Sequence, residues 1–171
     1  MDQKVIHLKR IGINAELQRS KVAERLQHNF YDPNEFCIML MHYDDGSMPK
    51  PDRIQRSLLG TFGGVSIATD NIKASILFWD KVGFRQCAKS NMPYAWAELT
   101  DDIVKIVLHQ TGTFSAPAIT YYASDVAERI GALHRNKITI THELKTDNTD
   151  TKGAILTAPD GQLFFLLNGV S

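Results

Sequence analysis

The stretch Val65-Ser-Ile-Ala-Thr-Asp70 recurs in outline about 55 residues later as Ile119-Thr-Tyr-Tyr-Ala-Ser-Asp125. Each copy has the composition of a short strand and ends in an aspartate that precedes a helix-type pattern. The helix patterns cover 71–82 and 126–135, and three strand-type patterns follow each of them. The order strand, helix, strand, strand, strand thus occurs twice, about 55 residues apart. Because each sequence repeat normally folds as one supersecondary unit, we predict two βαβββ modules. We therefore expect an α+β fold; a generic α+β domain whose halves are similar by chance is the alternative.

The repeat defines the bounds of the two modules. We place the first module at 61–112 and the second at 116–169. Thr69-Asp70 and Ser124-Asp125 are candidate N-caps, and Gly83 stands just after the first helix, where glycine is favoured. The sequence predicts strands at 63–68, 84–89, 94–99 and 103–109 in the first module, and at 118–123, 139–144, 154–158 and 162–167 in the second.

Residues 1–60 do not share this repeat and form an N-terminal extension to the domain at 61–171. Apolar residues at three-to-five-residue steps indicate a helix, whereas a short apolar run indicates a buried strand or, as the alternative, a short helix. The expected elements are a strand at 5–8, a helix over 14–30, the apolar strand within 35–43, a turn-rich loop at 44–51 and a short helix from the cap Asp52 to Leu59.

The chain has 171 residues, of which 43% are hydrophobic and 22% are charged, as in ordinary globular proteins. Lysine plus arginine and aspartate plus glutamate each total 19, so the formal net charge is zero. Nucleic-acid binding normally needs a surplus of basic residues, so we expect no nucleic-acid partner. Cys37 and Cys87 are too few for a disulfide framework, and no apolar run is long enough to span a membrane. These features favour a cytoplasmic protein without a membrane partner.

Three stretches resemble the vicinal oxygen chelate superfamily, which includes glyoxalase I, bleomycin-resistance proteins and extradiol dioxygenases. Val65 to Asp70, followed by Ala74-Ser-Ile-Leu-Phe-Trp79 and Val82-Gly-Phe84, is similar to the superfamily's first strand, its helix and the exit from that helix. Ala158-Pro-Asp-Gly161 is similar to its closing hairpin, and Ile119 to Asp125 repeats the opening. The resemblance covers about 110 residues, none of them in the N-terminal extension. It implies a curved mixed sheet that forms a cup for a ligand.

The resemblance also provides a test for a metal site. Metal-dependent members carry His, Gln or Glu at the head of the first strand and on the last strand of each module. Matched residue by residue, these positions fall on Gly63, Ala118, Val107 and Phe165, which have no side-chain donor atoms. We therefore expect neither a metal ion nor another cofactor, and glyoxalase or dioxygenase chemistry is disfavoured. A shift of two residues would bring His109 inward, but a single histidine does not make a metal site.

No other cluster in the sequence points to a catalytic residue. His42 lies near Asp44 and Asp45 beside the turn-rich loop, where solvated side chains are the usual outcome. Cys87 and His109 have the chemistry of a thiolate pair, but no flanking motif supports it, and we favour a buried structural thiol. The sequence contains no phosphate loop and no nucleophile elbow. It therefore favours a protein without catalytic activity.

Six residues are candidates for the wall of a ligand site. Alternate residues of a strand share a face, so Lys105 and His109 lie on the face of Val107. In the preceding strand Trp96 shares a face with Tyr94, and the small alanines between them suit the side that a helix covers. Aromatic walls with a few polar groups hold flat organic molecules or cations. The candidate ligand-binding residues are Tyr94, Trp96, Lys105, His109, Tyr121 and Phe165; the alternative is that several of them only fill the core.

The leading hypothesis is a metal-free, small-molecule-binding protein of the bleomycin-resistance type. Such a protein would sequester a small organic ligand in the cup between the two modules. A diverged lyase, isomerase or dioxygenase is one alternative, and a protein-interaction module that uses residues 1–60 is the other. We also expect a homodimer, because similar proteins often build the cup across two chains and zero net charge does not oppose association. Whether the modules pair within one chain or across two is left open by the sequence.

Overall fold

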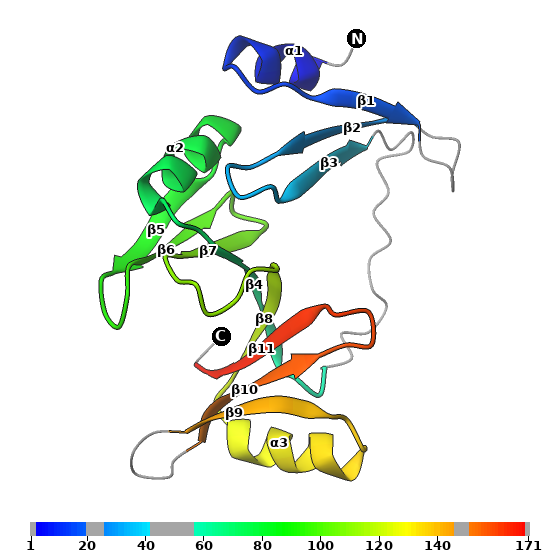
Figure 1. Cartoon of the computed structure of the whole chain (residues 1–171), viewed down its shortest axis with the longest axis vertical. Coiled ribbons are helices and arrows are strands. Elements are labelled where there is room, and N and C mark those ends of the chain that lie inside the picture. The colour runs from blue at the N-terminus through cyan, green and yellow to red at the C-terminus, as the bar shows by residue number, and fades with distance from the viewer. Residues whose placement is uncertain (1–2, 20–25, 42–56, 146–150, 170–171) are drawn as a thin grey trace.

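The computed structural model describes residues 3–19, 26–41, 57–145 and 151–169. Its main feature is an eight-stranded mixed sheet in the order β5-β6-β7-β4-β8-β11-β10-β9 (Figure 1). Two βαβββ modules in an α+β fold are therefore confirmed, with element bounds that differ from the expected ones by a few residues. The first module consists of β4 Thr61–Ala68, α2 Ile72–Val82, β5 Arg85–Ser90, β6 Trp96–Thr100 and β7 Lys105–His109. The second consists of β8 Ala118–Ala123, α3 Val126–Arg135, β9 Ile140–Lys145, β10 Thr151–Thr157 and β11 Leu163–Asn168.

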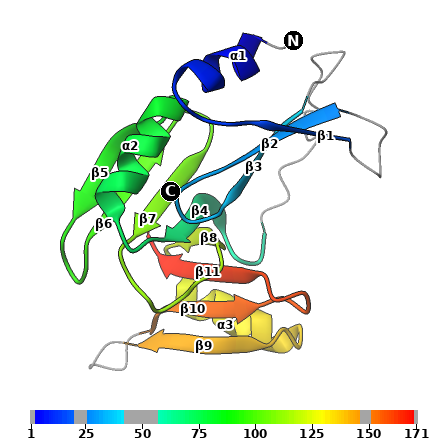
Figure 2. The same ribbon diagram turned by 45° about the horizontal axis from the view of Figure 1, so that its top comes forward.

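The two modules pair within one chain. β4 lies antiparallel to β8, with Val65 opposite Ile119 and Ser66 opposite Ala118. In each module the first strand also pairs in parallel with the last strand, β4 with β7 and β8 with β11. The central strands β4 and β8 therefore have hydrogen-bonded neighbours on both sides. The sheet is continuous from one module to the other. Figure 2 shows α2 against the strands of the first module and α3 against those of the second.

The ends of α2 follow from local sequence. Asn71 is the N-cap, and its side chain accepts a hydrogen bond from the N–H of Ala74 at 3.1 Å. The cap is thus one residue later than Thr69-Asp70, and Thr69 instead accepts a hydrogen bond from the N–H of Asn71. At the other end Gly83 has a φ of 111°. This left-handed conformation favours glycine, so the predicted helix end is confirmed.

The eight-stranded sheet has two different faces. Its outer face packs on the helices through two apolar clusters, one around Trp79 of α2 (Ile67, Leu99, Ile106, Leu108) and one around Leu133 of α3 (Ala154, Leu156, Leu166). Intervening residues of the same strands point to the opposite side, because successive side chains alternate. We call that side the inner face; it presents Ser66, Glu98, Lys105, Val107, His109, Thr120 and Phe165.

A helix and a second, three-stranded antiparallel sheet form what we call the N-terminal layer. It consists of α1 Gln3–Arg10, β1 Glu16–Arg19, β2 Leu26–Tyr31 and β3 Cys37–Met41, with the sheet order β1-β2-β3. The layer packs on α2, where the Phe30 ring lies 6.5 Å from that of Phe78 and the Phe36 ring lies 6.4 Å from that of Trp79. It therefore extends the core of the first module on the outer face, away from the inner face.

Two expectations for the N-terminal part are wrong. In place of the helix over 14–30 the chain forms β1 and β2, in which Leu17 pairs with His28. Leu17 is 59% exposed whereas Phe30 is 2% exposed, so only one of these two apolar residues reaches the core. Residues 5–8, expected as a strand, lie in α1, where Val5 and Leu8 face the core at the three-residue spacing of a helix.

Of the remaining expectations for the N-terminal part, one corresponds to a strand of the structure and others fall outside the described residues. The strand predicted within 35–43 is confirmed as β3 over Cys37–Met41, but it is not buried, since Cys37 is exposed and Met39 is 54% exposed. The loop at 44–51 and the start of the helix from Asp52 lie outside the described residues, and Ser57 forms an isolated β-bridge with Gly60. Among the residues that the structure describes, no helix is both long and apolar enough to cross a membrane.

Candidate functional site

The inner face of the first module brings several predicted residues together on adjacent strands. In the register of β6 and β7, Trp96 lies opposite His109 and Thr100 opposite Lys105. Directly opposed residues share a face of the sheet, so Trp96, Lys105 and His109 all belong to the inner face. Ala97, which is 1% exposed, points to the outer face, as the alternation predicted. Trp96 is half-buried, so part of its ring surface remains accessible to a ligand.

A hydrogen-bonded chain runs through His109 and crosses the boundary between the modules. The hydroxyl of Tyr94 lies 3.2 Å from Nδ1 of His109, and Nε2 lies 3.2 Å from Oγ of Ser66. Ser66 continues to Oγ1 of Thr120 in the second module at 2.7 Å. Burial lowers the pKa of His109 to about 4, so its ring is neutral near pH 7. A neutral imidazole donates through one nitrogen and accepts through the other, which suits a hydroxyl at each end.

Phe114 closes this end of the inner face, and the sequence analysis missed it. Its ring lies 5.6 Å from that of His109 and 5.1 Å from that of Phe165, both edge-on. The two contacts join the β7 end of the first module to β11 of the second. Phe114 lies in the segment between the modules, where no periodicity assigns a face. Its aromatic character in an otherwise polar connection was the one available signal.

The other end of the inner face is polar and hollow. Nζ of Lys105 lies 3.0 Å from Oε1 of Glu98, and the thiol of Cys87 donates to the same oxygen at 3.2 Å. The hydrogen bond to Glu98 raises the pKa of Lys105, and partial burial followed by the bond to Glu98 raises that of Cys87. Cys87 is exposed, so the expectation of a buried structural thiol is wrong. Beside this group is a cavity of 370 Å³, lined by Thr61, Phe62, Gly63, Glu98, Lys105, Tyr122 and Gly169. Such a volume accommodates a small organic molecule.

Tyr122 owes its position over this cavity to a neighbouring glycine. A Cβ at Gly63 would lie 2.4 Å from two ring carbons of Tyr122, closer than any real contact allows. Gly63 therefore leaves the space that the tyrosine ring fills. Burial raises the pKa of Tyr122, so its hydroxyl stays protonated and can donate or accept a hydrogen bond. Tyr122 is a second residue that the sequence analysis missed.

Of the six candidates, Tyr121 is the one that the structure separates from the others. It pairs in register with Leu166, whose side chain belongs to the outer cluster around α3. Its ring lies 6.1 Å from that of Phe62. Tyr121 thus points to the outer face, whereas Phe165, which pairs with Thr120, points to the inner face. Tyr94, Trp96, Lys105 and His109 complete the inner-face set.

The four positions that correspond to metal ligands do not fit a metal ion. Val107 lies on the inner face opposite Glu98 and Ser66, Ala118 lies opposite Ser66, and Phe165 contacts Phe114. Their side chains, like that of Gly63, carry no nitrogen, oxygen or sulfur donor. In the part of the chain that the structure describes, there is also no group of three or more His, Cys, Asp or Glu suited to hold a metal.

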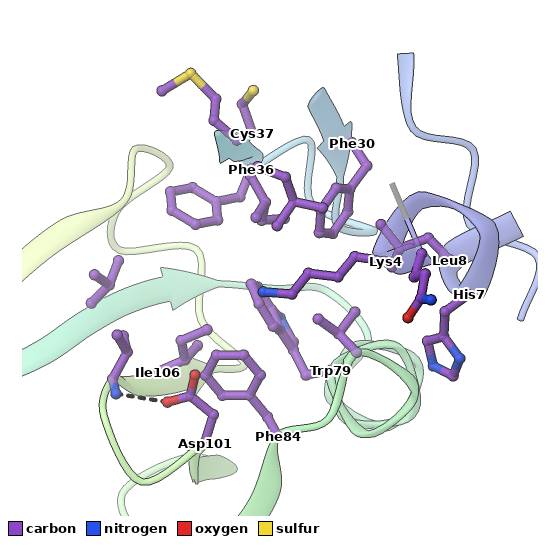
Figure 3. A pocket seen from close by; sticks show the side chains of 17 residues that line it. Lys4, His7, Leu8, Phe30, Phe36, Cys37, Trp79, Phe84, Asp101 and Ile106 are labelled. Carbon is purple, nitrogen blue, oxygen red and sulfur yellow. Dashed lines mark hydrogen bonds between the residues drawn. The ribbon is translucent and has the colours of Figure 1, made fainter. Parts of the chain in front are cut away.

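A second cavity, of 760 Å³, lies on the outer side of the first module, against the N-terminal layer. Figure 3 shows Phe30 and Phe36 on one side of it and Trp79, Phe84 and Ile106 on the other. The sequence analysis did not anticipate this cavity, because it depends on how the N-terminal layer packs on α2.

By sequence the chain matches no protein-family model and no curated protein. By structure it is similar to a catechol 2,3-dioxygenase, with a TM-score of 0.60 and 16% identity over 98% of this chain. It is similar to the 2,3-dioxygenase LapB from a Pseudomonas species, with a TM-score of 0.63 and 12% identity over 99% of this chain. It is also similar to a variant of homoprotocatechuate 2,3-dioxygenase from Brevibacterium fuscum, with a TM-score of 0.59 and 11% identity over 94% of this chain.

These similarities show a shared fold, since the identities are low. The chain spans 64% of the catechol 2,3-dioxygenase chain, 67% of LapB and 49% of the Brevibacterium enzyme. The matched part includes the N-terminal layer, because almost the whole of this chain is covered.

Proposed function

We propose that this protein, which has the fold of the vicinal oxygen chelate superfamily, binds a small planar organic molecule on the inner face of its sheet without a metal ion. The observation that carries the proposal is the 370 Å³ cavity beside Glu98, Lys105 and Tyr122. The aromatic residues that line the cavity are Phe62 and Tyr122. The half-buried Trp96 lies two residues from Glu98 on the same face of β6, so the inner face continues from the cavity towards Trp96. Binding would sequester the molecule, as in a bleomycin-resistance-type protein.

The chemistry of the cavity supports recognition of a flat molecule with polar substituents. The Lys105 ammonium and the Tyr122 hydroxyl are donors, and the Glu98 carboxylate is an acceptor. The side chains of Lys105 and Glu98 are 49% and 19% exposed, so a ligand can reach both. An aromatic wall adds affinity by stacking. A metal-dependent lyase, isomerase or dioxygenase is the weaker alternative, because it would need donor atoms where Gly63, Val107, Ala118 and Phe165 stand.

A thermal-shift screen tests the proposal. The probes are planar aromatic compounds that carry hydroxyl, amino or carboxylate groups. A ligand at about 100 times its Kd raises the free energy of unfolding by about 2.7 kcal/mol, which shifts Tm by several degrees. We expect at least one such compound to bind. Binding should weaken by roughly 5- to 150-fold in Trp96→Ala, which loses a stacking wall.

Two lysine variants locate the binding. Lys105→Met removes the donor at the cavity, whereas Lys89→Met alters a lysine that pairs with Ala97 and so lies on the outer face. The Tm shift should shrink in Lys105→Met and persist in Lys89→Met. A panel without any hit, or a shift that neither Lys105→Met nor Trp96→Ala reduces, would contradict a ligand site on the inner face.

A further inference from the structure

The carboxylate of Glu98 receives two donors on the inner face, and both contacts are made to the same oxygen. Nζ of Lys105 lies 3.0 Å from Oε1, and the thiol of Cys87 donates to Oε1 at 3.2 Å. A carboxylate accepts hydrogen bonds at both of its oxygens, so Oε2 can accept one from a ligand. Because Glu98 lines the 370 Å³ cavity and its side chain is 19% exposed, a ligand in the cavity reaches this carboxylate.

A β-bulge aims Cys87 at the carboxylate. In the register of β5 and β6 a bulge makes Cys87 an extra residue, next to Ala88, which lies opposite Glu98. Bulges place two residues against one of the neighbouring strand and so redirect a side chain. The thiol accordingly also lies 3.4 Å from the backbone oxygen of Glu98. Cys87 therefore holds the carboxylate from the side of β5.

The charges around the cavity are balanced. Among the described residues that line it, Glu98 and Lys105 are the charged ones, and they form an ion pair. The Lys105 ammonium has several N–H donors, so it can also bind a ligand while it contacts Glu98. An anion placed on Lys105 would lie close to the carboxylate, and a cation placed on Glu98 would lie close to the ammonium. Repulsion between like charges at short range disfavours both, which leaves a neutral ligand.

Two glycines fix an aromatic wall of the same cavity. A Cβ at Gly63 would lie 2.4 Å from two ring carbons of Tyr122, and a Cβ at Gly169 would lie 2.8 Å from Cδ1 of that ring. The ring therefore fills the space that the two glycines leave. Burial and then the charge of Glu98 raise the pKa of Tyr122, so its hydroxyl lies near the ion pair. The cavity thus combines a fixed ring with a donor and an acceptor that are neighbours.

We propose that the ligand of this cavity is a neutral planar molecule of the lactam type. Its amide N–H donates to Oε2 of Glu98, and its carbonyl oxygen accepts from the ammonium of Lys105. A lactam carries this donor and this acceptor side by side on one edge of its ring, as the ion pair requires. Cys87 is a positioning residue, because it holds Oε1 and leaves Oε2 for the ligand. The inference rests on the proposed function, since it names the ligand class of the same cavity.

Four bicyclic probes of similar size test the ligand class by isothermal titration calorimetry with the full chain. Carbostyril is a neutral lactam, and coumarin has a ring oxygen in place of its N–H. Naphthoate is an anion, and naphthylmethylammonium is a cation. We expect carbostyril to bind roughly 10- to 100-fold more tightly than coumarin, as the loss of a hydrogen bond to a charged group predicts. It should also bind more tightly than either ion.

The outcomes separate the ligand class from the ligand site. Equal binding of carbostyril and coumarin, or tighter binding of either ion, would overturn the lactam class and leave the proposed function in place. The same holds if carbostyril does not bind but another planar compound gives a Tm shift that Lys105→Met reduces. Absence of binding by every planar compound would overturn the proposed function together with the lactam class.

A variant of Glu98 tests the charge balance. Glu98→Gln removes the carboxylate and leaves the Lys105 ammonium without its ion pair. Carbostyril should then bind at least about tenfold more weakly, and naphthoate should bind more tightly than to the wild type. Glu143→Gln is the matched control, because Glu143 also pairs with a lysine, Lys145 at 3.2 Å, but lies on β9 of the second module. An unchanged preference in Glu98→Gln, or an equal change in Glu143→Gln, would overturn the inference.

Two variants of Cys87 distinguish a positioning role from a structural one. Cys87→Ser keeps a donor for Oε1, whereas Cys87→Ala removes it. The ratio of carbostyril to coumarin affinity should fall by roughly 3- to 10-fold in Cys87→Ala and stay near the wild-type value in Cys87→Ser. A change in stability alone would leave this ratio unchanged. An unchanged ratio in Cys87→Ala would therefore contradict the positioning role.

Discussion

At the scale of single residues, His109 links the acid stability of the fold to the inner face. Its ring is buried between Tyr94 and Ser66, and burial lowers its pKa to about 4, below the usual 6.5. Between these two values the unfolded chain binds a proton at this residue and the folded chain does not. The free energy of unfolding therefore falls as the pH falls from about 6.5 towards 4.

We expect this residue alone to remove about 2 kcal/mol of stability between about pH 7 and pH 5. Urea unfolding of the wild type and of His109→Gln at both pH values measures the effect, and the variant should lose less stability over the interval. His142→Gln, at an exposed position on β9, is the control and should lose as much stability over the interval as the wild type does. An equal loss in His109→Gln and the wild type would contradict the role of His109.

Strand alternation predicted which face of the sheet a residue occupies where every second residue of the strand is apolar. In β7 the outer residues Ile106 and Leu108 are both buried, so the assignment of Lys105 and His109 to the other face followed. In β8 two consecutive tyrosines, Tyr121 and Tyr122, point to opposite faces of the sheet. Alternation alone does not show which of them lies on the inner face; the pairing of β8 with β11 and β4 places Tyr122 there.

At the scale of elements, two glycines of different conformation predict opposite effects of the same substitution. Gly83 ends α2 with a φ of 111°, and an added Cβ would meet no atom within 4 Å. Gly83→Ala should therefore lower the free energy of unfolding by about 1–2 kcal/mol through backbone strain alone.

Gly131 lies inside α3, where an added Cβ would meet only the end of the flexible Arg135 side chain, at 3.4 Å. Gly131→Ala should raise the free energy of unfolding by about 0.5–1 kcal/mol, because alanine is the better helix former. Urea unfolding of both variants is the measurement. Destabilisation by Gly131→Ala, or no change in Gly83→Ala, would show that these local conformations do not control the two helices.

The helices and strands were predicted correctly where residues close in sequence, such as helix caps, determine them. The helices of the two modules have capping residues and apolar residues on one face, and they appear at the expected places. In the N-terminal part the steps between Leu17, Val22, Leu26 and Phe30 were compatible with a helix. Pairing of β1 with β2 and packing of Phe30 on Phe78 favoured strands instead. Tertiary contacts of this kind override weak local propensity.

At the scale of the whole molecule we propose a homodimer. The two modules already join through β4 and β8, so a dimer is not needed to complete the eight-stranded sheet. On one face of its sheet the N-terminal layer exposes Tyr31 and Met39 by 51% and 54%, and neighbouring exposed apolar side chains are typical of contacts between chains. Light scattering at micromolar concentration should give about twice the chain mass of 19.2 kDa. A mass of one chain at every concentration would contradict the dimer.

The sequence by itself determined the two βαβββ modules, the order of their elements and the lack of donor atoms at the metal positions. These features depend on periodicity, caps and residue identity, which neighbouring residues in the chain express directly. Tertiary structure alone decided that β4 pairs with β8 in one chain, that Phe114 contacts both His109 and Phe165, and that Tyr122 fills the space over Gly63. It also decided the strands of the N-terminal layer. Each of these outcomes depends on contacts between residues that are far apart in the chain, and local propensity does not encode such contacts.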